Sequence, residues 1–250
     1  MSSAMTPLDR GAGIHVTPST LAPAPHRQTV VHGAVRHAVQ RDLERLALVL
    51  AEPVTAVRRA ALIGHSGFLL DQLLAHHRLQ DQAIWPVLVA RRPDLADLGE
   101  RVARSHAELL DPIGSVRQAV LRWKAAPGER LEALSALQGL GPRLAPVLDL
   151  DTELLPVACA AMPADGWAAV ERRPWPGGPA WLGRPGWLGS PTRLARRTFW
   201  LLDELDPARA ALLLHRTPSA AMWVLRNGFS GAYNRSAYLM WVGGGTGPVV

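Results

Sequence analysis

Apolar residues recur at helical spacing over four long stretches of this chain, and that recurrence limits its fold more than any other feature. In the first stretch Val35, Val39 and Leu43 share one face, with charged side chains on the others. The four stretches cover about residues 28–52, 55–84, 93–123 and 130–160. Patterns typical of strands are nearly absent. Four long amphipathic helices with short connections predict an all-α fold, an up-down-up-down four-helix bundle.

Prolines indicate where these helices begin, end or bend. Pro53 separates the first helix from the second, and Pro93 opens the third. Pro86 is expected to disturb the last turns of the second helix, because proline lacks the backbone N–H that a helix needs. Pro142 and Pro146 are expected to interrupt or kink the fourth helix for the same reason.

The composition changes on both sides of the predicted bundle. Residues 1–27 are polar and Pro-rich, which predicts a disordered or extended arm before a bundle at 28–172. Residues 173–191 form a Trp-, Pro- and Gly-rich loop, expected either to cover the bundle's own site or to meet a partner, as in a homodimer. Shorter helices at 192–242 are predicted to pack on the bundle, and 243–250 form a flexible tail.

Composition also argues against several classes of protein. Cys159 is the only cysteine, so no disulfide can form within the chain, which fits the cytoplasm. The chain shows no secretory signal and no apolar run of about 18 residues, so no membrane span is expected. Its net charge of +6 comes from scattered arginines, with Lys124 as the only lysine. That pattern is typical of a GC-rich genome and predicts no nucleic-acid partner.

Each predicted bundle helix directs one residue of metal-ligand type toward its apolar face. These four residues are His32, His76, His106 and Asp151. A buried carboxylate is costly unless it is paired, so Asp151 needs a partner, and the inward histidines can supply it directly or through a metal ion. His77 and Asp81 share an adjacent face, where they either form a surface pair or serve, with Gln80, as less favoured metal ligands. His37 and His65 are interpreted as ordinary structural histidines.

Five segments resemble hemerythrin-like (HHE cation-binding) domains of the extended actinobacterial type. The most specific is AHHRLQDQAIWPVL, which is similar to the family's HHxxED signature followed by WP or FP. Another is RVARSHAELL, which resembles the family's third helix. The five segments are Ala75–Leu88, Val30–Leu46, Arg101–Leu110, Leu148–Val170 and Phe199–Pro218. The resemblance covers about residues 30–241 and implies a four-helix bundle that binds two irons through histidines and bridging carboxylates.

The ligand set that the resemblance implies is incomplete here. His32, His76, His106 and Asp151 stand at ligand positions, but Gln80 replaces the carboxylate expected after His76, and Pro146 replaces a histidine of the fourth helix. A neutral amide neither offsets metal charge nor bridges two ions well. The remaining set suits a single Fe, Zn or Mn ion rather than a two-iron centre, with Asp81 a less favoured substitute ligand. A metal-free site is the alternative.

Three functions are consistent with this pattern. The first is a hemerythrin-like metal-binding protein for dioxygen or a related small ligand. The second is an enzyme on the same fold that acts on a small organic substrate, as in specialised metabolism. In that case His76, His106 and Asp151 would be its acid-base residues, with or without a metal, in a non-haem metal oxidoreductase or a metal-free tailoring enzyme. The third is a metal-free regulatory or scaffolding bundle.

Overall fold

The computed structural model describes residues 27–162, 164–172, 191–215 and 217–242, and every regular element within them is a helix. The prediction of an all-α chain is thereby confirmed for these residues. The predicted arm, tail and Trp-rich loop lie outside them, apart from one residue at the edge of the arm and one at the edge of the loop. None of the described helices combines the length and the apolar character that crossing a membrane requires.

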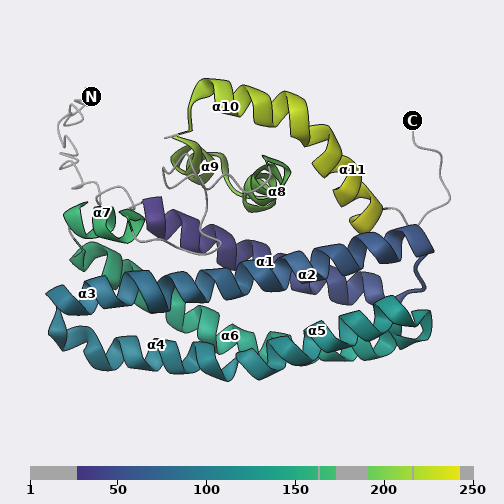
Figure 1. Cartoon of the computed structure of the whole chain (residues 1–250), viewed down its shortest axis with the longest axis horizontal. Coiled ribbons are helices and arrows are strands. Elements are labelled where there is room, and N and C mark those ends of the chain that lie inside the picture. The colour runs from purple at the N-terminus through teal and green to yellow at the C-terminus, as the bar shows by residue number, and fades with distance from the viewer. Residues whose placement is uncertain (1–26, 163, 173–190, 216, 243–250) are drawn as a thin grey trace, which may run out of the picture.

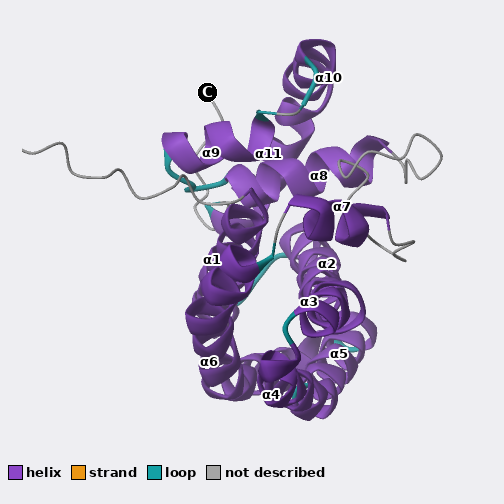
Figure 2. Cartoon of the chain, turned by 90° about the vertical axis from the view of Figure 1, so that its left-hand side faces the viewer, coloured by secondary structure: helices purple, strands orange, loops and turns teal. Residues whose placement is uncertain are grey.

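Four long helical stretches surround the main core, each in contact with its neighbours (Figures 1 and 2). Helix α1 packs against α2 and α6, and α5 packs against the same two helices from the other side. Large apolar side chains fill the space between them, with Trp123 among those wholly buried. The bounds of these helices are α1 Arg27–Ala51, α2 Ala56–Leu79, α3 Trp85–Arg91, α4 Ala96–Glu108, α5 Leu110–Ala125 and α6 Arg130–Ala161.

Shorter helices complete the fold. Helix α7 (Ala164–Arg172) packs against α3, and Trp85 and Trp167 meet there in a second apolar cluster. Helices α8, α9 and α11 lie across α1, and α11 also reaches α2, at the top of Figure 1. The bounds are α8 Pro191–Leu202, α9 Pro207–Leu214, α10 Ser219–Val224 and α11 Ser230–Trp241.

Proline has different effects at three places. Before Pro86, the turn η1 (Gln80–Ile84) is a π-helix in which Trp85 donates its backbone N–H to the Gln80 carbonyl, so α2 continues into α3. Pro112 cannot donate to the Glu108 carbonyl, and the third helical stretch breaks at Leu109 into α4 and α5. Pro142 and Pro146 were expected to interrupt or kink the fourth helix; the interruption is wrong, because α6 is helical throughout, and the kink stays a prediction.

Single-turn elements join the longer helices. Two 3-10 turns, η2 (Pro93–Leu95) and η3 (Pro127–Glu129), precede α4 and α6, and each starts with a proline that cannot extend the helix before it. A second π turn, η6 (Leu225–Phe229), links α10 to α11. Thr55 caps α2 by accepting the backbone N–H of Arg58 at 3.3 Å.

Candidate metal centre

Five inward polar residues from four helical stretches meet in the interior. His76 and His77 lie in the last turn of α2, His106 in the last turn of α4, and Asp151 in α6. His32 of α1 reaches the same region, its ring centroid 4.7 Å from that of His76. All five side chains are buried. The structure therefore brings together the four residues that the sequence singled out, along with His77, which the sequence offered as a less favoured ligand.

Gln80 occupies the place between His76 and Asp151. Its amide nitrogen donates to Asp151 Oδ2 at 3.0 Å and lies 3.0 Å from His76 Nε2. Because a carboxylate only accepts, the amide must turn its NH2 group toward Asp151, and the second hydrogen can go to an unprotonated His76 Nε2. Gln80 thus holds one Asp151 oxygen and one His76 nitrogen. The other carboxylate oxygen, Asp151 Oδ1, is buried without a hydrogen-bond partner.

His106 is held from one side by Asp81. Its Nδ1 donates to Asp81 Oδ1 at 2.7 Å, which fixes the orientation of the ring. The other nitrogen, Nε2, is buried without a hydrogen-bond partner and lies 3.7 Å from Asp151 Oδ1. The sequence placed Asp81 on an adjacent face of a regular helix. The π turn that begins at Gln80 breaks this periodicity, and Asp81 contacts His106 instead of forming a surface pair with His77.

His77 completes a group of three potential ligands. Its ring stacks on that of His106, with centroids 4.0 Å apart and planes 7° from parallel. Neither of its ring nitrogens has a hydrogen-bond partner although both are buried. One ligand atom from each of His77, His106 and Asp151 lies within 4.8 Å of the others. His32 also has two buried ring nitrogens without partners, but it lies beside His76, outside this group.

The pKa values of the residues in this cluster are shifted in different directions. Burial, with some repulsion from neighbouring imidazoles, lowers the pKa of His32 and of His77 well below the ordinary value. Burial also disfavours charge on His106, but the carboxylates of Asp151 and Asp81 outweigh it and raise its pKa to about 9. Burial opposes ionisation of Asp151 too, yet the imidazoles of His106 and His76 hold its pKa below the usual range. His32 and His77 are therefore neutral imidazoles, the form that binds metal ions, whereas His106 would have to release its Nε2 proton on binding one.

A second polar cluster, absent from the sequence analysis, joins α1 to the C-terminal helices. Buried Asp42 accepts hydrogen bonds from His65 Nε2 at 2.7 Å, Trp200 Nε1 at 2.8 Å and Arg41 Nε at 2.8 Å. His65 is thus a structural histidine, but with a carboxylate partner. Asp42 could have been recognised, because it lies one turn before Leu46 on the apolar face of the first helix.

The Asp42 cluster predicts weaker folding in acid. Burial opposes ionisation of Asp42, but His65 and Arg41 hold the pKa of its carboxyl below the ordinary value. The stabilisation is therefore complete above the unfolded-state pKa of about 4, and it is lost as pH falls through the folded-state value. Urea unfolding at stepped pH should show this decline, and Asp42→Ala should reduce it. An equally steep decline in that variant would contradict the assignment.

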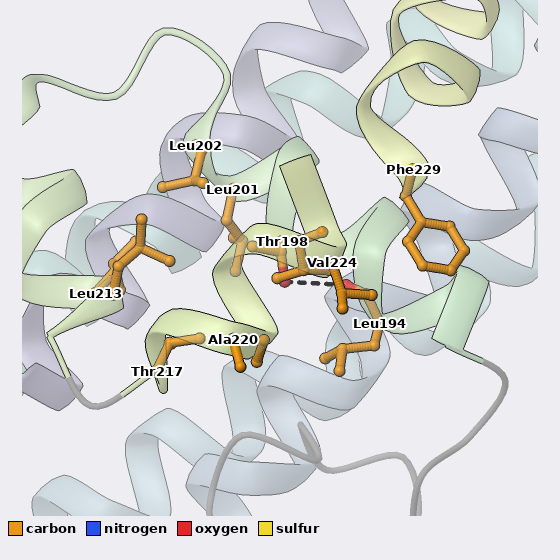
Figure 3. Close-up of a pocket in the computed structure, with 12 residues that line it drawn as sticks. Leu194, Thr198, Leu201, Leu202, Leu213, Thr217, Ala220, Val224 and Phe229 are labelled. Carbon is orange, nitrogen blue, oxygen red and sulfur yellow. Dashed lines mark hydrogen bonds between the residues drawn. The ribbon is translucent and has the colours of Figure 1, made fainter. Parts of the chain in front are cut away.

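Two cavities lie away from the histidine cluster, among the C-terminal helices. The larger, of about 360 Å³, opens between α8, α9 and α10 and has almost entirely apolar walls (Figure 3). Its Thr198 hydroxyl donates to the Leu194 carbonyl at 3.0 Å, so that hydroxyl is already satisfied. The smaller, of about 190 Å³, lies on another side of α8 and includes His65 and Arg196 in its wall.

Comparison of the chain with protein-family models, with curated proteins and with solved structures gives no match.

Proposed function

We propose that this chain is a hemerythrin-like metal-binding protein whose interior site holds one divalent ion through His77, His106 and Asp151. The observation that carries the proposal is a set of buried ligand atoms without hydrogen-bond partners on these three residues. Leaving such atoms unsatisfied costs free energy, and a bound cation would recover it. Imidazole and carboxylate together suit Fe, Zn or Mn.

The donor set fits a single ion in its spacing as well as its chemistry. Ligands at 2.0–2.2 Å from a tetrahedral ion stand roughly 3.4 Å apart. His106 Nε2 and Asp151 Oδ1 are 3.7 Å apart, so only a small adjustment would bring both into range. Asp81 on His106 Nδ1 and Gln80 on Asp151 Oδ2 would orient the two ligands, as the outer partners of metal ligands commonly do.

The same residues do not fit the two-iron centre that the family resemblance implies. A bridging carboxylate needs both oxygens free, but Asp151 Oδ2 accepts from Gln80. Gln80 itself presents a donor where that centre needs a second carboxylate. His32 and His76 lie on the side where a second ion would sit, and the carboxylate oxygen beside them, Asp151 Oδ2 at 3.6 Å from His76 Nε2, already accepts from Gln80. We therefore assign one ion to the site.

The function that follows is binding of dioxygen or a related small ligand at the ion. A bound ion would keep a coordination position open for such a ligand, because this group of described residues offers it three ligands. The protein's residues exclude bulk water and hold the ligands in place. The packing of four helical stretches around the site is compatible with the up-down-up-down bundle of hemerythrin-like proteins.

A metal-free enzyme is the second candidate, and one observation favours it. The side chains of His76, Gln80 and Asp151 are linked by hydrogen bonds that need no ion. His106, with its raised pKa, would then be an acid beside Asp151, whose pKa is lowered by the neighbouring imidazoles. This candidate leaves the nitrogens of His77 unexplained, which is why we place it second.

Elemental analysis of protein purified without a metal-chelating tag tests the proposal. We expect about one ion per chain in the wild type and in His76→Ala, and little metal in His77→Ala or Asp151→Ala. His37→Ala is the matched control, because His37 is exposed on α1. Two irons per chain would contradict the single-ion site. No metal after anaerobic reconstitution with Fe, Zn and Mn would favour the enzyme.

Asp81→Asn should weaken metal binding without removing a ligand. An amide accepts the His106 N–H less strongly than a carboxylate, so the ring becomes a poorer donor and is held less firmly. We expect the dissociation constant for Zn2+ to rise by about 10- to 100-fold, measured by competition with a chromogenic chelator. Asp97→Asn, on an acidic residue near the start of α4, is the control. Equal affinities in wild type and Asp81→Asn would exclude an orienting role for Asp81.

Gln80→Glu should move the site toward the two-ion state. It places a carboxylate between His76 and Asp151 and removes the amide donor that occupies Asp151 Oδ2. We expect the iron content after anaerobic reconstitution to rise from about one to about two ions per chain. Gln138→Glu adds the same charge on the exposed side of α6 and should leave the content unchanged. An unchanged content in Gln80→Glu would show that other features limit the site.

A further inference from the structure

The smaller cavity lies where α2, α8 and α11 meet, and its walls combine aromatic surface with a few polar groups. Its volume is about 190 Å³. Aromatic and apolar side chains make most of the wall, namely Phe68, Trp200, Phe229 and Met240. The polar groups are Arg196, His65, Thr192, Tyr233 and Ser236. Apolar walls with a few convergent polar groups are typical of small-molecule sites.

Arg196 is the only arginine or lysine among the described residues of this wall. Its guanidinium carbon lies 4.2 Å from the centroid of the Phe68 ring. Its Nη2 lies 3.4 Å from the Gly64 carbonyl and 3.4 Å from His65 Nδ1. Among the described residues, no carboxylate forms an ion pair with it. Arg41 and Arg45, nearby on α1, are by contrast paired with Asp42 and Asp203.

His65 separates Arg196 from the nearest buried acid. Its Nε2 is bonded to Asp42 Oδ2, and its Nδ1 faces a guanidinium, which can only donate. The ring is therefore the neutral tautomer with a lone pair on Nδ1. A neutral His65 cannot offset the positive charge of the partly buried Arg196. That charge is therefore uncompensated in the cavity.

We propose that this cavity binds a small monocarboxylate with an aromatic or compact apolar body. Its carboxylate would pair with the Arg196 guanidinium, whose planar fork suits that group. Its body would lie against Phe68 and Phe229. An apolar cavity of about 150 Å³ accommodates benzene, so the volume here suits a molecule the size of benzoate. The apolar walls favour such a molecule over inorganic phosphate. The site is separate from the histidine cluster and does not depend on a metal.

Benzoate binding to the full-length protein tests this site, by isothermal titration calorimetry and saturation-transfer NMR. We expect saturable binding to the wild type, and binding at least about tenfold weaker for benzamide, which keeps the shape but lacks the charge. Arg196→Gln should weaken benzoate binding to a similar extent. Arg193→Gln, which removes an exposed arginine from the same helix, should not.

A second variant tests whether benzoate binding depends on the cavity itself and not only on the charge of Arg196. Ala232→Phe fills the cavity but leaves Arg196 in place, and it should also abolish benzoate binding. Far-UV circular dichroism and metal content should be unchanged in both variants, which separates this site from the proposed metal centre. No saturable binding of benzoate to the wild type would overturn the proposal. Equal affinities for benzoate and benzamide, or unchanged affinity in folded Arg196→Gln, would also overturn it.

Discussion

Replacing His106 by alanine is expected to weaken binding of Zn2+ by on the order of 100-fold or more. The variant loses the Nε2 atom that lies 3.7 Å from Asp151 Oδ1, and with it one of three candidate ligands. The free energy of a structural zinc site is about 10–16 kcal/mol over some four ligands, so each ligand carries a large share. Competition titration against a chelator of known affinity measures the change.

Asp151→Asn tests the acidic ligand by the same measurement of Zn2+ affinity. It keeps the size of the side chain but removes the negative charge that offsets the ion, and we expect a similar loss of affinity. Asp149→Asn is its control, because Asp149 lies on α6 with 64% of its side chain exposed and pairs with Arg36 at the surface. Affinities within about threefold of wild type in both His106→Ala and Asp151→Asn would place the ion, if any, elsewhere.

Asp42→Ala is expected to reduce the free energy of unfolding by about 3–5 kcal/mol, because it removes one member of a buried charged network. Asp42 is only 1% exposed and accepts from Arg41, His65 and Trp200. Without it the Arg41 charge loses a buried partner and two ring N–H donors are left unpaired. Urea unfolding followed by circular dichroism measures the change.

The control for this substitution is an exposed ion pair. Asp71 of α2 is 66% exposed and bonds Arg117 at 2.6 Å, so Asp71→Ala should cost less than about 1 kcal/mol. If Asp42→Ala does not fold, Trp200→Phe removes a single donor and should still cost about 1–2 kcal/mol. Similar stabilities for Asp42→Ala and Asp71→Ala would show that the network contributes little.

The helices could be predicted from the sequence because their apolar periodicity is local. The stretch that begins near residue 28 and the short helix at 164–172 are present as predicted. The break at Leu109 was not predicted, whereas the π turn at Gln80 lies where Pro86 is expected to disturb the last turns of the second helix. Each arises from a proline whose effect depends on how the surrounding helix is packed. Helix α6, by contrast, continues without a break through Pro146.

The candidate site could be predicted in composition but not in its contacts. His32, His76, His106 and Asp151 were selected because they lie on apolar faces, and all four are buried together. Which of them face one another depends on the relative axial positions of the helices, and a single sequence does not give these. The stacking of His77 on His106, and the hydrogen bond of Asp81 to His106, depend on that tertiary arrangement.

The Asp42 and Arg196 contacts were missed for a related reason. The Asp42–His65 contact joins α1 to α2 across 23 positions, and the Arg196–His65 contact joins α8 to α2 across 131. The sequence predicted that helices at 192–242 pack on the bundle but gave no way to identify which side chains meet. Arginines were numerous and evenly spread, so composition alone could not indicate that Arg196 lacks a counter-ion.

The central claim is that one ion is held by His77, His106 and Asp151. The most direct test is an anomalous difference map from crystals grown with Zn2+ and recorded on both sides of the zinc absorption edge. We predict one interior peak per chain, within bonding distance of these three residues and with Gln80 still bonded to Asp151. Two interior peaks, a peak bound by His32 and His76 instead, or no interior peak at all would contradict the account.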